Sequence, residues 1–452
     1  MSKNSKTQFV CRECGFDSAK WYGRCPECGN WNSFDEIALE TKSENKKIID
    51  FNSSQRPQSM DKIKSVRENR ISTGFEEFDR VLGGSPGIPG SMGIVPGSAI
   101  LLSGDPGVGK STLLLQLALS LAADGQKVLY VTGEESEGQV KLRAERIELK
   151  KSAVNQNLLI FSTSDIDRAL EHAALEKCNL LIVDSIQTMG SADFTGFPGS
   201  VPQIRNCTAR IVAFAKKNSV PTFLIGHVTK EGSVAGPMIL SHMVDTVLFL
   251  EGEKITGTRV LRSFKNRFGD TSEVGIFLMD EKGLSQIQDI SDFFVDKNSQ
   301  KVPGSCLTVV MEGSRPIIVE VQALVVPTNM TFARRVANGI SEKRLELLLA
   351  VIQKHTHIHL EKMDVFVNIV GGLKISETAS DLAICLALIS SFKAKSISSS
   401  VAIGEVGLLG EIKSVSNLEK RIREANKFGF KNVITVNQGK FLNEAISRAF
   451  KR

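Results

Sequence analysis

Short apolar runs separated by polar segments that contain glycine mark the middle of the chain. These runs occur within residues 98–103, 127–136, 158–162, 179–184, 222–226 and 246–250. Runs this short and this apolar are typical of strands buried on both faces, as in parallel sheets. The first run leads into an apolar helical stretch, and the later intervals are long enough for helical crossovers. The pattern therefore predicts an α/β core.

The pattern changes at about residue 290. Residues 316–325 and 364–370 alternate between apolar and polar positions, which predicts strands with one covered face. Residues 378–392 form an apolar helical stretch, and residues 402–415 are rich in turn-forming glycine. These features predict a second α/β domain of roughly 150 residues.

Residues 36–65 are polar and follow neither a helical nor a strand period, so we interpret them as a linker. A chain of 452 residues also exceeds what one hydrophobic core usually serves. The predicted organisation is a module over 1–35, a linker over 36–65, and larger domains over 66–285 and 290–452.

Charge and hydropathy narrow the functional classes only slightly. The net charge of +6 is compatible with a polyanionic partner but does not require one. The amino-terminal residues lack the apolar core of a signal peptide, and the longest apolar run, 113–123, is too short to span a bilayer. We therefore expect a cytoplasmic protein that does not contact a membrane.

Four of the eight cysteines lie in the first thirty residues and form two CxxC pairs. They are Cys11, Cys14, Cys25 and Cys28. Two such pairs present four thiolates to one tetrahedral metal, so we predict a structural Zn²⁺ without an open catalytic position. Two disulfides or a redox-active pair are disfavoured in the cytoplasm, and iron in a rubredoxin-like site is the remaining metal alternative.

The sequence GDPGVGKST, residues 104–112, fits the phosphate-binding loop pattern GxxxxGK[ST] between a predicted strand and a predicted helix. Backbone amides of such a loop face the phosphates of ATP; Lys110 is expected on the β- and γ-phosphates and the Ser111 hydroxyl on Mg²⁺. The predicted nucleotide-binding residues of the loop are Gly104, Asp105, Pro106, Gly107, Val108, Gly109, Lys110, Ser111 and Thr112.

Three acidic residues follow two other predicted strands. Asp184 ends the run NLLIVD and is the candidate that helps hold Mg²⁺, although an acid capping the next helix would occupy the same position. Glu134 and Glu135 follow residues 127–132, and one of them could polarise the attacking water. A solvated acidic turn is the alternative for this pair.

The order of these parts resembles the RecA-like ATPases. That resemblance implies that Glu134 is the activating carboxylate and that His227 stands where the family has a polar phosphate sensor. It also implies an assembly in which ATP lies between subunits. Lys265 and Arg267, two residues apart on an extended segment, would then reach into the neighbouring site; spacing alone favours a solvated basic hairpin instead.

Several motifs together resemble the bacterial RadA (Sms) family of DNA repair proteins along nearly the whole chain. They are the four cysteines, GDPGVGKST, the KNRFG motif at 265–269, RPIIVEVQALV and RRVANGISEKRLELLLAVIQKH. The resemblance implies a hexameric, ATP-driven motor that loads on single-stranded DNA and extends branched recombination intermediates alongside a recombinase. It also implies that Lys265 and Arg267 are required for the motor.

The carboxyl-terminal domain resembles the Lon protease domain, which uses a Ser/Lys pair. The nucleophile position falls on Ala379 and the lysine position on Glu419, and neither side chain performs acyl chemistry. Ser380 and Lys420 lie one residue later, but a shift of one residue turns a helical side chain by about 100°. We therefore predict a proteolytically inactive scaffold; an ATP-dependent protease and a nucleotide-switched binding module are the alternatives.

The resemblance to RecA-like motors implies that the loops between the Asp184 strand and the following strands contact DNA. These loops, 187–210 and 230–243, are rich in glycine and serine. Within them Arg205, Arg210 and Lys230 are the candidate phosphate contacts.

Overall fold

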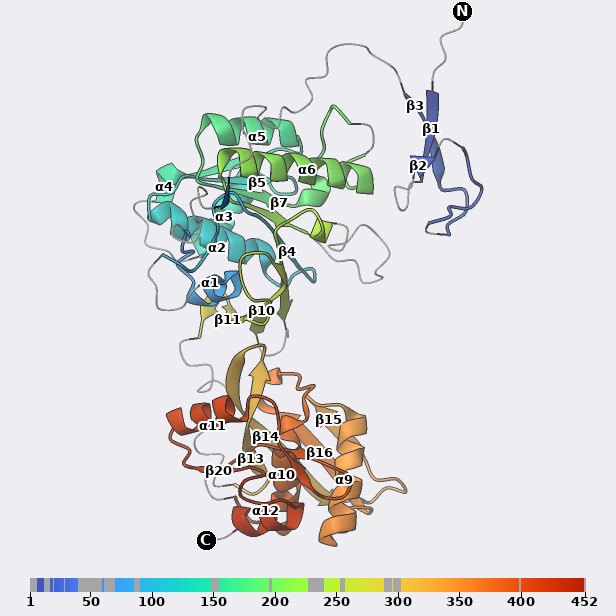
Figure 1. Ribbon diagram of the computed structural model, residues 1–452, viewed down its shortest axis with the longest axis vertical. Coiled ribbons are helices and arrows are strands. Elements are labelled where there is room, and N and C mark those ends of the chain that lie inside the picture. The colour runs from blue at the N-terminus through green and yellow to red at the C-terminus, as the bar shows by residue number, and fades with distance from the viewer. Residues whose placement is uncertain are drawn as a thin grey trace, which may run out of the picture. The chain divides into compact units, whose positions relative to one another are not determined.

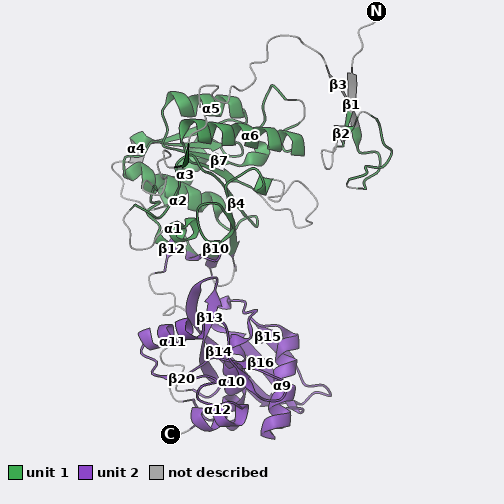
Figure 2. Ribbon diagram, in the orientation of Figure 1, with its two compact units in different colours: residues 1–251, 260–271, 279–284 green, residues 252–259, 272–278, 285–452 purple. Residues whose placement is uncertain are grey.

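The computed structural model describes most of the chain. The described residues are 6–11, 17–18, 20–27, 29–39, 59–60, 70–84, 90–147, 154–194, 197–226, 240–252, 257–287, 295, 302–397 and 400–450. The chain divides into two compact units (Figure 2), the first comprising residues 1–251, 260–271 and 279–284 and the second comprising 252–259, 272–278 and 285–452. The predicted limits 66–285 and 290–452 remain our proposal for the two larger domains.

A small antiparallel sheet forms the amino-terminal module. Strands β1 (Lys6–Cys11), β2 (Asp17–Ser18) and β3 (Phe34–Leu39) pair in the order β2-β1-β3. In this register Cys11 lies opposite Phe34, and both side chains are buried together with Cys25. The core of the module is therefore a few residues around two of its cysteines.

A nine-stranded sheet, in the order β12-β11-β10-β9-β4-β8-β7-β5-β6, organises the middle of the chain (Figure 1). The six strands from β9 to β6 run parallel, as predicted. Their bounds are β4 Ala99–Gly104, β5 Val128–Thr132, β6 Leu158–Ser162, β7 Leu180–Asp184, β8 Thr222–Ile225 and β9 Thr246–Gly252. The others are β10 Thr258–Asn266, β11 Val274–Asp280 and β12 Gly283–Gln286.

Helices cover both faces of this sheet (Figure 1). On one face α5 (Ile166–Leu175) and α6 (Val201–Asn218) pack into a single apolar cluster with the strands. On the other face α1 (Glu76–Leu82) and α2 (Lys110–Ala123) are packed, and the Phe78 and Phe223 rings meet edge to face at 5.8 Å. Helices α3 (Glu137–Arg146) and α4 (Val154–Asn157) contact β6 at the edge of the sheet. Because helices cover both faces, the strands can be continuously apolar.

The second unit contains a six-stranded sheet in the order β15-β16-β14-β13-β17-β20. Its strands are β13 Ser305–Glu312, β14 Arg315–Pro327, β15 Arg335–Asn338, β16 Met363–Ile369, β17 Ser400–Ala402 and β20 Asn432–Ile434. One face packs against α9 (Glu342–Thr356), α10 (Asp381–Lys393) and α12 (Leu442–Ala449). Helix α11 (Leu418–Lys427) packs on the other face. A hairpin of β18 (Glu405–Val406) and β19 (Ile412–Lys413) completes the unit.

An ion pair between the buried Arg421 and the partly exposed Glu377 ties α11 to the rest of this unit. The Arg421 side chain is fully buried and donates to both carboxylate oxygens of Glu377, at 2.7 and 2.6 Å. The same guanidinium donates to the carbonyl oxygens of Val309 and Ser416, at 2.6 and 2.9 Å. Such a charge is tolerated in a protein interior only when it is paired and hydrogen-bonded.

Replacing Arg421 by Met should therefore destabilise the second unit by about 2 kcal/mol, because it removes the hydrogen bonds of the buried guanidinium and leaves the partly exposed Glu377 carboxylate without its cation. The measurement is native-state hydrogen exchange of the α11 and β13 amides. The exposed Arg423, on the same helix, is the matched control, and Arg423→Met should leave exchange unchanged. Equal effects from the two variants would contradict the role assigned to this ion pair.

Candidate functional site

The phosphate-binding loop joins β4 to α2 at the carboxyl edge of the parallel strands. Gly104 and Gly109 have φ angles of 148° and 111°, which favour glycine. A Cβ atom on Gly104 would lie 2.2 Å from the carbonyl oxygen of Leu250, so β4 and β9 leave no space for a side chain there. Both positions therefore require glycine for the backbone conformation, and Gly104 also because a side chain would not fit.

The loop and the start of α2 fit the phosphates of ATP. Helix α2 begins at Lys110, and no side chain caps its first turn, so its amides face the loop. The Lys110 ammonium donates to the carbonyl oxygens of Gly104 and Asp105, at 2.8 and 3.0 Å. Burial lowers the pKa of Lys110, while the carboxylates of Asp184, Asp105 and Glu134 oppose that shift. The cation is thus held inside the loop among three acidic groups.

Asp184 ends β7 at the same edge of the sheet, as expected. The hydroxyl of Tyr130, on neighbouring β5, donates to Asp184 Oδ2 at 2.5 Å. Tyr130 is fully buried, and desolvation together with the adjacent Asp184 raises its pKa well above the usual value. The phenol therefore stays protonated and orients the Asp184 carboxylate, which has the oxygen ligands that suit Mg²⁺.

The structure distinguishes the two adjacent glutamates after β5. Ser185, directly after Asp184, donates its hydroxyl hydrogen to Glu134 Oε1 at 2.7 Å. Glu135 instead forms an ion pair with Arg143 on α3. Glu134 therefore lies with Asp184 and Lys110, whereas Glu135 secures a helix.

The KNRFG motif is bound to its own chain at nearly every residue. Lys265 donates to the carbonyl oxygens of Ser241 and Val244, at 2.6 and 2.8 Å, and burial lowers its pKa. Asn266 donates to the carbonyl oxygens of Val81 and Leu82 at the end of α1. These contacts fix the backbone of the motif.

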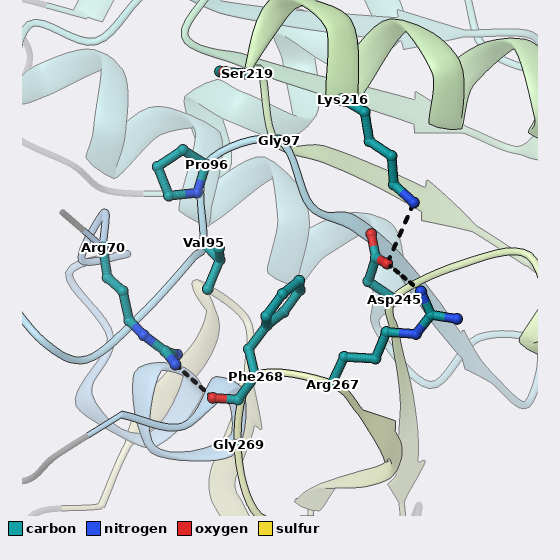
Figure 3. Close-up of a pocket in the computed structure, with 10 residues that line it drawn as sticks. All are labelled: Arg70, Val95, Pro96, Gly97, Lys216, Ser219, Asp245, Arg267, Phe268 and Gly269. Atoms are coloured by element: carbon teal, nitrogen blue, oxygen red, sulfur yellow. Dashed lines mark hydrogen bonds and ion pairs between the residues drawn. The ribbon is translucent and has the colours of Figure 1, made fainter. Parts of the chain in front are cut away.

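The last two residues of the motif lie against the segment around α1 (Figure 3). The Arg70 guanidinium donates to the carbonyl oxygen of Phe268. A Cβ atom on Gly269 would lie 3.0 Å from the Cα of Gly83, so the two backbones approach as closely as glycine permits. Glycine at 269 is therefore a packing requirement.

Arg267 is the exposed member of the motif. Its side chain is 53% exposed and pairs with Asp245, whose side chain is 5% exposed, at 3.2 Å (Figure 3). Asp245 also accepts the backbone N–H of Ala99, the first residue of β4, at 3.1 Å. With Lys216 and Arg70, these residues line a cavity of about 850 Å³. Arg267 therefore lies at the amino end of β4, whereas the phosphate loop follows its carboxyl end.

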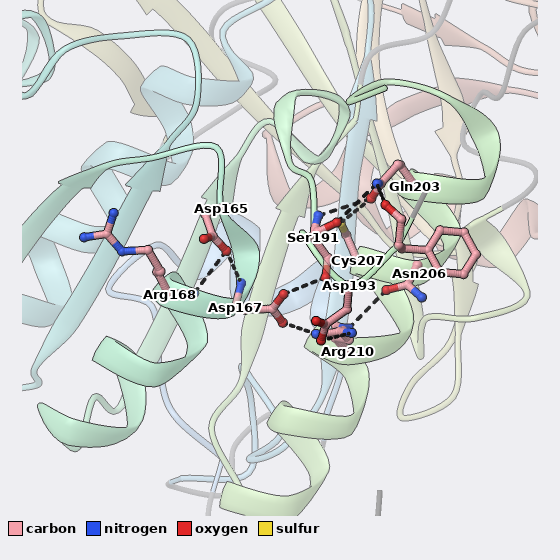
Figure 4. A network of polar contacts seen from close by, with 10 residues as sticks. Asp165, Asp167, Arg168, Ser191, Asp193, Gln203, Asn206, Cys207 and Arg210 are labelled. Atoms are coloured by element: carbon pink, nitrogen blue, oxygen red, sulfur yellow. Dashed lines mark hydrogen bonds and ion pairs between the residues drawn. The ribbon is translucent and has the colours of Figure 1, made fainter. Parts of the chain in front are cut away.

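The predicted DNA-contacting arginines differ in their surroundings. Arg210 on α6 pairs with both Asp167 and Asp193, so two carboxylates of its own chain hold it (Figure 4). Arg205 is exposed on the same helix and lines a cavity of about 590 Å³ with Phe194 and His242. The contacts favour Arg205 over Arg210. Lys230 and His227 lie outside the described residues.

The amino-terminal module fits a metal centre in its described part. Cys11 and Cys25 are buried within one small apolar cluster. The backbone N–H of Gly29 donates to the carbonyl oxygen of Cys25 at 2.9 Å, and Gly29 has a φ of 75°, which gives the turn of a metal-binding knuckle. Cys14 and Cys28, the other two predicted ligands, lie outside the described residues.

Comparisons with known proteins were made on sequence and structure. One family model, described as an AAA domain, matches residues 88–233, and another, described as a rubredoxin metal binding domain, matches residues 9–36. DNA repair protein RadA from Halalkalibacterium halodurans and that from Bacillus subtilis are each 44% identical to this chain, over 95% of it and 92% of their own lengths. The chain belongs to the bacterial RadA family of DNA repair proteins.

A third curated relative agrees with this assignment. DNA repair protein RadA from Listeria monocytogenes is 43% identical over 94% of this chain and 91% of its own length. Among solved structures, a KaiC-like protein from Pyrococcus horikoshii has a TM-score of 0.39 and 21% identity, covering 48% of this chain and 99% of its own.

Membership of the RadA family confirms the predicted fold class, with a P-loop ATPase core, an N-terminal zinc ribbon and a mixed α/β architecture. ATP and Zn²⁺ are the groups that these domains bind. Among the described residues, no helix is both long and apolar enough to cross a membrane.

Sequence reasoning missed two residues that shape the site. Tyr130 could have been noticed as a lone tyrosine within an aliphatic strand, a position that requires a buried hydrogen-bond partner. Asp245 gave no such signal, because an acid at the start of a strand usually lies in solvent.

Glu134→Gln should reduce ATP turnover at least about a hundredfold while preserving nucleotide binding. The substitution removes the carboxylate beside Asp184 and Lys110, but glutamine has nearly the same size and shape as glutamate. Glu135→Gln is the matched control and should stay within about threefold, because its partner is Arg143 rather than the nucleotide edge. Steady-state phosphate release and nucleotide binding measure the two effects. A larger loss in Glu135→Gln would reverse the assignment.

The intact chain should contain one zinc ion, and both Cys11→Ser and Cys14→Ser should lose it, because four thiolates are needed to close the site. Elemental analysis of purified protein gives the metal content directly. Cys178→Ser, a buried cysteine of the ATPase core, should keep its zinc. Full zinc content in Cys14→Ser would show that Cys14 is not a ligand.

Proposed function

We propose that this RadA family member is a DNA-dependent ATPase of recombination and repair in the cytoplasm. It loads on single-stranded DNA and drives branch migration of recombination intermediates, together with a recombinase. The working form is a ring, as in hexameric motors, with ATP between adjacent subunits. One observation carries the proposal: the KNRFG motif and the phosphate loop lie at opposite ends of β4.

The length of β4 argues against action within one chain. Six residues of strand span roughly 20 Å, far more than an arginine side chain can bridge. Arg267 therefore cannot reach the γ-phosphate of its own subunit. In a head-to-tail assembly, the amino edge of one sheet faces the carboxyl edge of the next, and Arg267 then meets the neighbour's nucleotide.

Each polar group has a defined part in this reaction. Lys110 leaves the loop carbonyls for the β- and γ-phosphates, and the Ser111 hydroxyl and the Asp184 carboxylate hold Mg²⁺. Glu134 positions and polarises the attacking water. The incoming Arg267 stabilises the charge that develops on the transferring phosphoryl group.

Lys265 is the second trans candidate. Its ammonium already uses two of three donors on Ser241 and Val244. Within the described residues the third N–H has no acceptor, so it can donate to the nucleotide bound by a neighbouring subunit. Lys265 would then link that nucleotide to the turn before β9.

Single-stranded DNA would bind near Arg205. An exposed arginine beside Phe194 and His242 offers a phosphate contact and ring surfaces for stacking bases. Phe197, in the same loop region, is 87% exposed. Exposed aromatic rings near a cation suit sequence-independent binding of a single strand.

The carboxyl-terminal domain is proposed to be a scaffold without peptidase activity. Ala379 and Ser380 are buried, whereas Glu419 and Lys420 are exposed on α11. A shift of one residue therefore pairs a buried hydroxyl with a solvated amine. Arg421 lies two residues after Glu419, and its partner Glu377 lies two residues before Ala379.

Single-stranded DNA should stimulate ATP hydrolysis, and Lys110→Ala and Arg267→Ala should each reduce it at least about a hundredfold, since trans-acting arginines contribute strongly to turnover. An equal mixture of the two variants should recover activity. In a randomly mixed ring, roughly a quarter of the interfaces combine an intact loop with an intact arginine.

Arg262→Ala is the matched control, because Arg262 lies on β10, which ends one residue before Arg267, and pairs with Glu251. Its activity should stay close to that of the intact protein. Absence of recovery in the mixture, with both variants still assembling, would place Arg267 outside the neighbour's site. Hydrolysis that does not respond to DNA would contradict the motor.

A further inference from the structure

A cavity of about 640 Å³ lies on the sheet of the second unit. Helix α11 covers this face over β13, β17 and β20, where Leu307, Ile318 and Ala425 form an apolar cluster. Towards β14, β16 and β15 the face is open: Leu324 is 54% exposed and Val336 is 44% exposed. The cavity begins where the cover of α11 ends.

Strand register arranges the cavity in rows. One row contains Ser305, Gln322, Asn368 and Asn338, which lie opposite one another across four strands. The next row, two residues along, contains Leu324, Phe366 and Val336. A polar row thus lies beside an apolar row on the same face of the sheet.

Glu320 lies on β14, two residues before Gln322 and on the same face. Its side chain is fully buried and lines the cavity. Glu320 Oε1 accepts from the Ser305 hydroxyl at 2.9 Å and from the Gln322 amide at 3.0 Å. Within the described part of the chain, Oε2 has no hydrogen-bond partner.

The described lining of the cavity offers this carboxylate no cation. None of the described residues that line the cavity is lysine, arginine or histidine. A buried carboxylate with only one oxygen hydrogen-bonded destabilises a folded protein. Ile318 and Leu324 lie on the same strand and the same face and are apolar, so packing alone does not require a carboxylate at position 320. The arrangement is complementary to a positive charge that arrives from outside.

We propose that this cavity binds an arginine side chain, flanked by apolar residues, from a protein partner. Because Glu320 has no exposed surface, the Gln322 side chain turns aside as the guanidinium enters. The guanidinium then donates to Glu320 Oε2 and to the side-chain oxygen of Gln322. Its methylene stem and the neighbouring side chains of the partner lie over Leu324, Phe366 and Val336. Consecutive rows lie roughly 7 Å apart, so an arginine side chain spans the polar row from the apolar one.

The lining chemistry favours a guanidinium over a metal ion. Divalent cations require several oxygen or nitrogen ligands around one point, and the described structure has no group of three histidine, cysteine or acidic residues placed to hold a metal ion. A planar fork of N–H donors matches one carboxylate oxygen beside amide oxygens. The apolar row would contribute no favourable contact to a bare metal ion.

The test is calorimetric titration of the full-length chain with acetyl-Leu-Arg-Leu-amide. Saturable binding is expected, at least tenfold tighter than for the same peptide with citrulline, which is neutral and similar in shape. Glu320→Gln should weaken arginine-peptide binding at least tenfold, because it keeps the Ser305 and Gln322 contacts but removes the charge. Glu346→Gln, at an exposed glutamate on α9, is the matched control and should bind normally.

Thermal unfolding of the same variants without peptide separates recognition from a structural role. Glu320→Gln should raise the unfolding midpoint of the second unit, because it relieves an unpaired buried charge. A lowered midpoint would make Glu320 a structural group and overturn the proposal. Equal binding of arginine and citrulline peptides, or saturable binding of spermidine or Mg²⁺ without binding of the arginine peptide, would overturn it as well.

Discussion

The carboxylate of Asp245 is the contact on which the ATPase core depends. It is almost fully buried and accepts the first backbone N–H of β4, while it pairs with the exposed Arg267. A buried carboxylate is stable only with such partners. One side chain therefore joins the central strand of the sheet to the KNRFG motif, and the position of the motif becomes fixed relative to the phosphate loop at the other end of β4.

The core and the loop could be predicted from the sequence because their causes are local. A strand buried on both faces must be apolar, and a backbone that wraps phosphates must contain glycine, so both leave direct marks. The different roles of Glu134 and Glu135 leave no such mark in the sequence. They depend on Ser185 and Arg143, which lie elsewhere in the sequence and approach the glutamates only in the folded sheet.

The same limit applied to the candidate DNA contacts and to the second domain. Arg205 and Arg210 are equivalent in the sequence, but Asp167 and Asp193 hold only Arg210. Ala379 and Glu419 were enough to predict the loss of a Ser/Lys pair. The burial of Arg421 and its ion pair with Glu377, by contrast, could not be predicted, because charged side chains usually lie in solvent. Sequence patterns thus predict the features that backbone geometry requires. Which charged side chains remain available to bind a ligand depends on contacts that form only in the folded protein.

The separation of the phosphate loop and Arg267 along β4 has a consequence for regulation. Under the proposed trans arrangement, a solitary chain holds two halves of a catalytic centre that can never meet within it. Such a chain still binds ATP but keeps it intact, since the stabilising cation is missing. Dilution alone then silences the enzyme, and gathering on a DNA strand switches it on without a dedicated inhibitor.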